Sequence, residues 1–171
     1  MPASPLAVFA RLRFLEPAGS ELFRISPDKS AGANPFRRVW LSGRRGGILI
    51  MTIDLTDATF ASRVTQGIVL VDWWASWCGP CRAFAPVFDA AAARHPDVTF
   101  AKVNVEAEQD LAATFRIRAI PTLTVIRDGV VLASQSGAVS GPMLDELIEQ
   151  VRRLDMDAVR REVQTRRQAI A

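Results

Sequence analysis

The most informative segment of the chain is Ile68-Val69-Leu70-Val71-Asp72-Trp73-Trp74-Ala75-Ser76-Trp77-Cys78-Gly79-Pro80-Cys81. Its first seven residues are aliphatic or aromatic apart from one aspartate, which is typical of a strand buried on both faces. Helix-forming residues follow from Cys78 to His95. The segment therefore predicts a strand that leads into a helix, with two cysteines in the first helical turn.

The sequence on either side predicts further strands and helices in alternation. Strands are expected at 51–54, 98–105, 122–126 and 130–136, and helices at 57–64, 108–115 and 140–151. Asp128-Gly129 is a strong hairpin signal between the last two strands. This order implies an α/β fold with a mixed central sheet of about five strands, flanked by helices on both faces.

The length and composition predict one folded domain with an extension at each end. A chain of 171 residues is long enough for one full-sized domain and short for two. We expect the domain at residues 51–153 and a helical extension at residues 154–171. A helix over 155–168 has a narrow apolar side, formed by Leu154, Met156, Val159 and Val163. Such a stripe predicts only weak docking.

Residues 1–50 read as a poorly structured leader that need not be part of the mature protein. They hold 5 of the 10 glycines and 5 of the 10 prolines of the chain and show no sustained period. Three interpretations remain open for them: a targeting peptide, a disordered arm, or translated sequence upstream of a true start at Met51.

The charge and hydropathy patterns exclude several function classes. Residues 1–50 carry 8 Lys and Arg against 3 Asp and Glu, so the rest of the chain is slightly acidic despite the net charge of +3. The domain has no basic stripe interleaved with aromatic residues, so nucleic acid is not an expected partner. No apolar run reaches the roughly 18 residues of a membrane span, so no membrane association is expected.

The chain has two cysteines, Cys78 and Cys81, and this spacing is typical of a redox or a metal site. A structural zinc needs four ligands, and two cysteines with the single His95 are too few, so no metal is expected. A disulfide that closes so short a loop adds little stability. The pair is therefore interpreted as redox-active.

The segment from Val71 to Arg82 resembles the active-site segment of the thioredoxin family. The similarity extends over about residues 52–152, because further residues match the family in order and spacing: Pro86, Lys102, Ile120-Pro121-Thr122 and Gly137. The resemblance implies the thioredoxin fold and an enzyme that reduces protein disulfides. It also implies that no cofactor is bound and that electrons come from NADPH through thioredoxin reductase.

The two cysteines are expected to have different roles in disulfide exchange. Unpaired amides and the dipole at a helix N-terminus stabilise a thiolate, so Cys78 is expected to be the nucleophile. Cys81, expected to be the more buried, then resolves the mixed disulfide. Gly79 and Pro80 tune the redox potential, and the resemblance implies a reductant, because oxidants and isomerases of this fold usually carry a histidine in this dipeptide.

Asp72 is unusual within an apolar strand. Burial of an unpaired carboxylate is costly, so its pKa should rise towards neutrality. The resemblance implies that Asp72 is the general base for Cys81 and that Lys102 modulates it. The alternative is a core aspartate that is satisfied by pairing with Lys102 and has no catalytic part.

The resemblance also implies a surface for substrate proteins around Cys78. Pro121 is expected to follow a cis peptide bond and to expose the backbone of Ile120 to substrate. An apolar collar is expected, formed by Trp77, Gly79, Pro80, Ile120, Pro121, Gly137 and Ala138. Two residues depart from the family: Arg116 stands where glycine is common, and Ser136 replaces an apolar residue.

The leading hypothesis is a monomeric, cytoplasmic protein-disulfide reductase, with thioredoxin reductase and disulfide-containing proteins as partners. A second is a binding module that uses the collar without turnover. A third, an oxidase or isomerase, is disfavoured by Gly79-Pro80 and by the lack of a secretory signal pattern.

Overall fold

Residues 52–170, the part of the chain that the computed structural model describes, form five strands and five helices. The elements are β1 (Thr52–Asp54), α2 (Asp57–Arg63), β2 (Ile68–Trp74), α3 (Gly79–Arg94), β3 (Thr99–Asn104), α4 (Gln109–Thr114), β4 (Thr122–Arg127), β5 (Val130–Ser136), α5 (Gly141–Arg152) and α6 (Met156–Ile170). Each element expected within this range is present, with ends that differ from the expected ends by a few residues at most. The leader expected at residues 1–50 and the start expected at Met51 lie outside the described residues.

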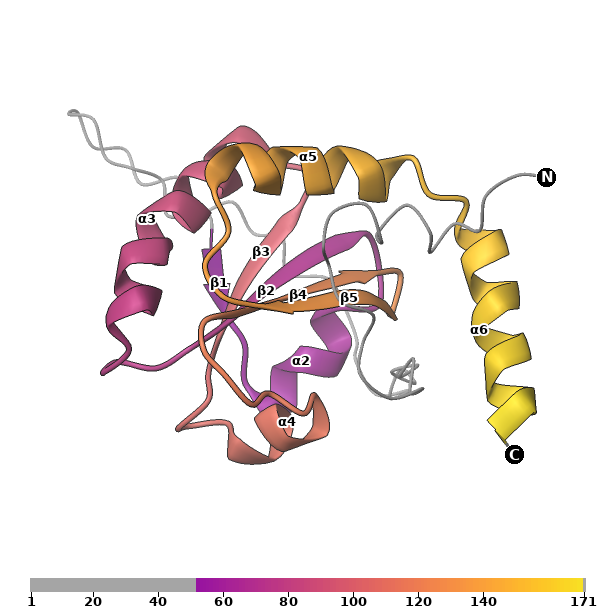
Figure 1. The fold of residues 1–171 in the computed structure, drawn as a ribbon, viewed down its shortest axis with the longest axis horizontal. Coiled ribbons are helices and arrows are strands. Elements are labelled where there is room, and N and C mark those ends of the chain that lie inside the picture. The colour runs from indigo at the N-terminus through magenta and orange to yellow at the C-terminus, as the bar shows by residue number, and fades with distance from the viewer. Residues whose placement is uncertain (1–51, 171) are drawn as a thin grey trace.

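The five strands form one mixed sheet in the order β1-β3-β2-β4-β5. β3 is parallel to both β1 and β2, whereas β4 is antiparallel to both β2 and β5. β2 lies at the centre with a neighbour on each side, and helices cover both of its faces (Figure 1). This position explains why its sequence is an almost unbroken apolar run.

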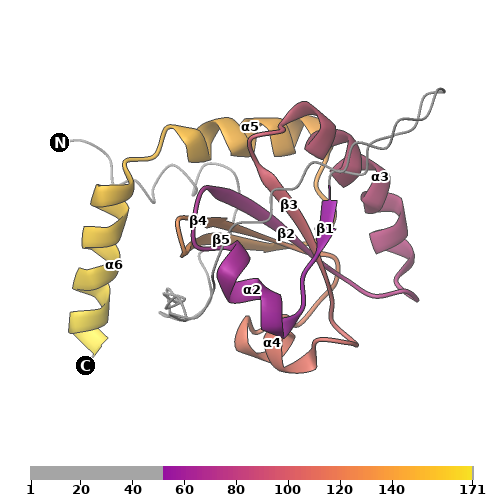
Figure 2. The same cartoon turned by 180° about the vertical axis from the view of Figure 1, so that it is seen from behind.

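The helices cover the sheet in two layers, α3 and α5 on one face and α2 and α4 on the other (Figures 1 and 2). The first layer packs on an α3/α5 core that includes Leu70, Phe88, Phe100, Leu147 and Ile148. The second packs on an α2/α4 core that includes Phe60, Val71, Trp73, Val103 and Leu111. Alternate residues of β2 enter opposite cores, so Asp72 shares the α3 face with Leu70.

The turn between β4 and β5 fixes the end of the sheet and also holds α5. Asp128 and Gly129 both have positive φ, 51° and 74°, as the expected hairpin turn requires. Oδ1 of Asp128 accepts a hydrogen bond of 2.9 Å from the amide of Gly67. The guanidinium of Arg127 donates to the carbonyl oxygens of Val151, Arg152 and Leu154 at the C-terminus of α5.

The C-terminal helix is present as α6, beyond the end of α5 (Figure 1). Leu154, Met156 and Val159 are buried in the α3/α5 core, and Val163 packs against it. The apolar side expected for this extension thus lies against the core that α5 already forms, and how strongly it docks there stays a prediction. Among residues 52–170 no helix is both long and apolar enough to cross a membrane.

Candidate active site

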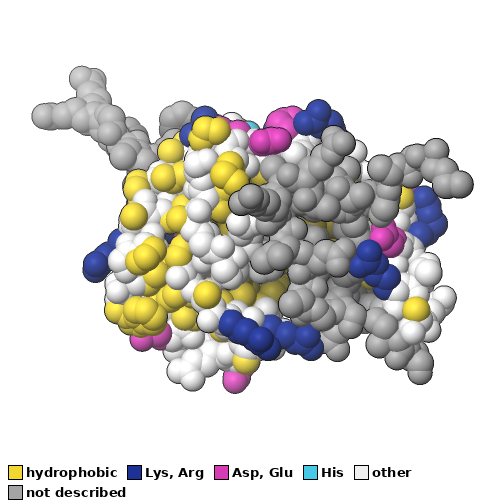
Figure 3. All heavy atoms as spheres, in the orientation of Figure 1, with side chains coloured by type: hydrophobic (Ala, Val, Ile, Leu, Met, Phe, Trp, Pro, Cys, Tyr) yellow, Lys and Arg dark blue, Asp and Glu magenta, His cyan; other side chains and the backbone are white. Residues whose placement is uncertain are grey.

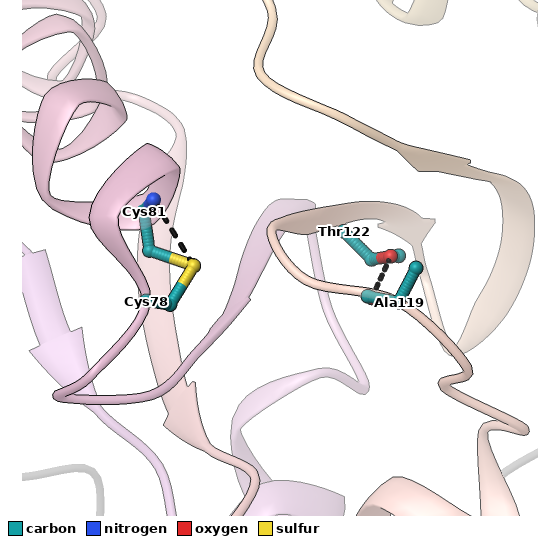
Figure 4. Close-up of a disulfide and its surroundings, with 4 residues drawn as sticks. All are labelled: Cys78, Cys81, Ala119 and Thr122. Atoms are coloured by element: carbon teal, nitrogen blue, oxygen red, sulfur yellow. Dashed lines mark hydrogen bonds between the residues drawn. A yellow bond between two sulfur atoms is a disulfide. The ribbon is translucent and has the colours of Figure 1, made fainter.

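Cys78 and Cys81 lie at the N-terminus of α3 and are joined in a disulfide, with their Cα atoms 5.3 Å apart. Cys78 is the N-cap residue, and Pro80 lies in the first turn, where its missing N–H has no helical partner to lose. The amide of Cys81 donates a hydrogen bond of 3.2 Å to Sγ of Cys78 (Figure 4). The helix therefore directs a donor at the sulfur that would carry the negative charge after reduction.

Both sulfur-bearing residues are buried in this oxidised state. Cys78 is 4% exposed and Cys81 is 3% exposed, so Cys81 is the more buried of the two, as expected, but only by a narrow margin. The two residues form a small cluster with Ala75, against which Trp74, Val105 and Ile120 pack. Shielding by these neighbours, rather than position along the helix alone, sets the exposure of each cysteine.

The loop before β4 faces the disulfide across the site (Figure 4). The peptide bond between Ile120 and Pro121 is cis, as expected. The hydroxyl of Thr122 donates a hydrogen bond of 2.7 Å to the carbonyl of Ala119 and so closes the loop on itself. The amide of Gly137, which has a φ of 100° that favours glycine, donates to the carbonyl of Pro121 at 2.8 Å.

The collar around Cys78 is partly exposed. Trp77 is 66% exposed, well above the 37% of Met143, the other exposed large hydrophobic residue of the described range. Gly79, Pro80, Gly137 and Ala138 are also exposed, Ile120 is half-buried, and Pro121 is buried. Hydrophobic side chains gather over the α3 side of the molecule, with few charged side chains among them (Figure 3). Such a surface fits contact with another protein.

Asp72 is 1% exposed and lies on the face of β2 that α3 covers. Burial raises the pKa of its carboxyl to about 7, while the positive charge of Lys102 opposes the rise and Asp89 adds to it. Oδ1 of Asp72 has no hydrogen-bond partner among residues 52–170. Lys102 lies opposite Asp72 in the β2–β3 register, yet its ammonium forms an ion pair with Asp89, at 3.6 Å.

The sequence did not single out Asp89, and this residue is the main addition that the structure makes to the site. It lies on α3, where its position relative to Cys81 carries no signal of a partner in β3. The structure also shows the surroundings of the two residues that depart from the family, although it does not explain the arginine at position 116. Arg116 has a φ of 53°, in the region that favours glycine, and Oγ of Ser136 lies 3.0 Å from Oγ1 of Thr122.

His95, the one histidine of the chain, lies away from the cysteines at the C-cap of α3. Its Nε2 is 2.8 Å from Oδ1 of Asp145 on α5. Within the described range no group of three or more His, Cys, Asp or Glu side chains is arranged to hold a metal ion.

Comparisons with known proteins agree with this geometry. Residues 51–152 match the Thioredoxin family model. The chain is 46% identical over 113 residues to Putative thioredoxin 2 of Streptomyces coelicolor, an alignment that covers 66% of this chain and 84% of that protein. It is 39% identical over 100 residues to the Thioredoxin of Pseudomonas aeruginosa, covering 57% of this chain and 93% of the relative.

Proposed function

The chain belongs to the thioredoxin family and is a thiol–disulfide oxidoreductase, and on this premise we propose that it is a general protein-disulfide reductase. One observation carries the proposal: the amide of Cys81 points at Sγ of Cys78 from 3.2 Å, at a helix N-terminus beside the exposed Trp77. A donor in this place lowers the pKa of a thiol, and the thiolate is the species that attacks disulfides.

The reaction begins with the reduced dithiol. The Cys78 thiolate attacks one sulfur of the substrate disulfide, which forms a Cys78–substrate disulfide and releases the other substrate sulfur as a thiolate. Cys81 then loses its proton and attacks Sγ of Cys78. This second step forms the Cys78–Cys81 disulfide and releases the second substrate thiolate. Two electrons pass from the dithiol to the substrate, and the substrate thiolates take up protons.

We assign the removal of the Cys81 proton to Asp72. A carboxylate with an ordinary pKa is a weak base, whereas burial raises the pKa of Asp72 to about 7 and so makes its carboxylate a stronger base. Cys81 lies on the sheet-facing stripe of α3 together with Phe84 and Phe88, and Asp72 lies on the sheet face beneath that helix. Lys102 limits the rise in the pKa and is assigned the modulating role.

We assign substrate docking to the collar. Trp77, Gly79, Pro80, Gly137 and Ala138 offer exposed contact area, and Ile120 borders both this area and the cysteines. The backbone of Ile120 would pair with an extended segment of the substrate, and Pro121 would hold that backbone in place. Gly79-Pro80 would set the reduction potential.

The electron source and the compartment follow from the same proposal. Members of the family typically bind no cofactor, and NADPH would supply electrons through a thioredoxin reductase, which would reduce the Cys78–Cys81 disulfide again. A reductant of this kind works in the cytoplasm, where thiols are kept reduced. A monomer is sufficient, because the cysteines, Asp72 and the collar all belong to one chain.

Reduction of insulin disulfides with dithiothreitol as the electron donor tests the proposal. Activity is expected from the wild-type chain and not from Cys78→Ser, whereas Cys81→Ser should accumulate mixed disulfides with its substrates. Loss of activity in Cys78→Ser with partner binding retained would add a binding role. Activity that survives in Cys78→Ser would contradict the mechanism.

Equilibration with glutathione tests the direction of electron flow. A reductant should equilibrate at about −270 mV, the general value for thioredoxins. A potential nearer to about −120 mV, as for a strong oxidant, would overturn the assignment as a reductase.

A further inference from the structure

Lys102 lies between two carboxylates on the face of the sheet that α3 covers. Its Cα pairs with that of Asp72 in the parallel β2–β3 register, so the two side chains leave the sheet on the same face. Phe100, two residues before Lys102, and Leu70, two residues before Asp72, both enter the α3/α5 core. The lysine therefore starts beside the buried Asp72 and extends under the helix.

The far end of Lys102 is held by α3. Its Nζ lies 3.6 Å from Oδ1 of Asp89, and the side chain of Lys102 is 19% exposed against 36% for Asp89. The same Oδ1 accepts a hydrogen bond of 3.4 Å from the hydroxyl of Thr52 on β1. Residues of α3 and β1 thus fix the position of the Asp89 carboxylate, which binds the Lys102 ammonium nearer to solvent than Asp72 lies.

We propose that Asp89 is a positioning residue, which holds the Lys102 ammonium away from Asp72 and so preserves the basicity of Asp72 for the deprotonation of Cys81. The functional part of this inference rests on the role assigned to Asp72 above. The positional part rests on the ion pair with Asp89, on the Thr52 hydrogen bond, and on the lack of a hydrogen-bond partner for Oδ1 of Asp72 among the described residues.

The physical reason is a competition between two carboxylates for one ammonium. A cation close to a carboxylate favours the ionised form and lowers its pKa. Were Lys102 to pair with Asp72, the carboxylate would be stabilised and would become a weaker base. Asp89 offers the ammonium a partner that is already hydrogen-bonded and partly solvated, so pairing there needs less desolvation than pairing with Asp72.

The test is the pKa of Asp72 in Asp89→Asn, followed by carboxyl carbon NMR in the disulfide form, where the cysteines do not titrate. We expect the pKa of Asp72 to fall by about 1, the lower end of the effect of a cation that moves close to a carboxylate. The matched control is Asp110→Asn, the same change at an exposed position of α4 on the other face of the sheet, and it should leave the pKa unchanged. An unchanged pKa in Asp89→Asn would overturn the proposal.

A second background separates positioning from a direct charge effect. In Lys102→Gln the pKa of Asp72 should rise, and the further change Asp89→Asn should then lower it by less than in the presence of the lysine, because only the direct contribution of the Asp89 charge is lost. If Asp89→Asn lowers the pKa equally with and without the lysine, Asp89 acts directly through its own charge and the positioning role is wrong. Circular dichroism establishes that each variant is folded.

A kinetic measurement connects the pKa to the reaction. In single turnover, the midpoint of the pH profile for release of substrate from the Cys78 mixed disulfide should fall in Asp89→Asn together with the NMR pKa. If the NMR pKa falls while resolution is insensitive both to this change and to Asp72→Asn, the base assignment fails and the positional inference stands. If the wild-type chain does not reduce insulin disulfides at all, the proposed function itself is refuted.

Discussion

Replacement of Asp72 by asparagine should stabilise the protein, and the gain should depend on pH. Burial raises the pKa of Asp72 from the ordinary 3.8 to about 7. The folded state therefore holds a proton that the unfolded state releases near pH 4. At about 1.36 kcal/mol for each pKa unit, ionised Asp72 destabilises the folded state by about 4 kcal/mol above pH 7.

The sign follows from the two protonation states. Below about pH 4 the carboxyl is neutral in both the folded and the unfolded chain, so it makes no electrostatic difference to stability. Between pH 4 and 7 the folded state binds more protons, and the wild-type chain loses stability as the pH rises. Asp72→Asn has no such dependence. The difference in free energy of unfolding between Asp72→Asn and the wild-type chain should therefore be larger at pH 8 than at pH 4 by about 4 kcal/mol, in favour of the variant.

Urea unfolding of both chains in the disulfide form at pH 4, 6 and 8 measures this difference. The slope of the free energy of unfolding against urea must be the same for the two chains, so that midpoints can be compared. Asp110→Asn serves as the control, because Asp110 is exposed. A stability difference between Asp72→Asn and the wild-type chain that is equal at pH 4 and pH 8 would refute the reasoning, whatever its size.

Three further predictions concern the supports of the fold. Truncation after Arg153 removes buried Leu154, Met156 and Val159, so calorimetry should show a Tm lower by more than about 5 °C, the equivalent of roughly 1 kcal/mol. A smaller fall in Tm would mean that α6 docks only weakly on the domain. Arg127→Met leaves three carbonyl oxygens at the end of α5 without their donor, so urea unfolding should give a loss of about 1–3 kcal/mol, and exposed Arg82→Met should give none. Asp128 has a positive φ and accepts a hydrogen bond from the Gly67 amide, so Asp128→Ala should lower the free energy of unfolding by about 1–3 kcal/mol. Asp128→Asn keeps an acceptor and should retain most of the wild-type stability. Equal losses in the two variants would mean that the charge of Asp128 matters more than this hydrogen bond.

The described fold is held together by residues that act on more than one element. Arg127 joins the β4–β5 turn to the end of α5, and Asp128 joins the same turn to the start of β2. At the site, Ile120 contacts the cysteine cluster from the loop before β4. The position of Cys78 relative to the proposed docking surface therefore depends on the packing of the whole sheet, and changes remote from the cysteines should alter exchange rates through that packing.

The sequence by itself determined those features that depend on near neighbours in the chain. The apolar run of β2, the Asp128-Gly129 turn and the stripe of Leu144, Leu147 and Val151 each express a local period or a local backbone preference, and each matches the structure. The cysteine pair at a helix N-terminus is also local, since Gly79-Pro80 starts the helix that both residues share. The chemistry of exchange could be inferred from this segment and from its family resemblance.

Only the tertiary structure decided which charges meet. Asp72, Asp89, Lys102 and Thr52 come from four elements, and no periodicity relates a helix position to a position in a strand beneath it. The ion pair of Lys102 with Asp89 follows from how α3 lies across the sheet. The exposure of the cysteines and the docking of Val159 were likewise set by neighbours distant in sequence. Burial and charge pairing are properties of packed surfaces, so they exist only once the chain has folded.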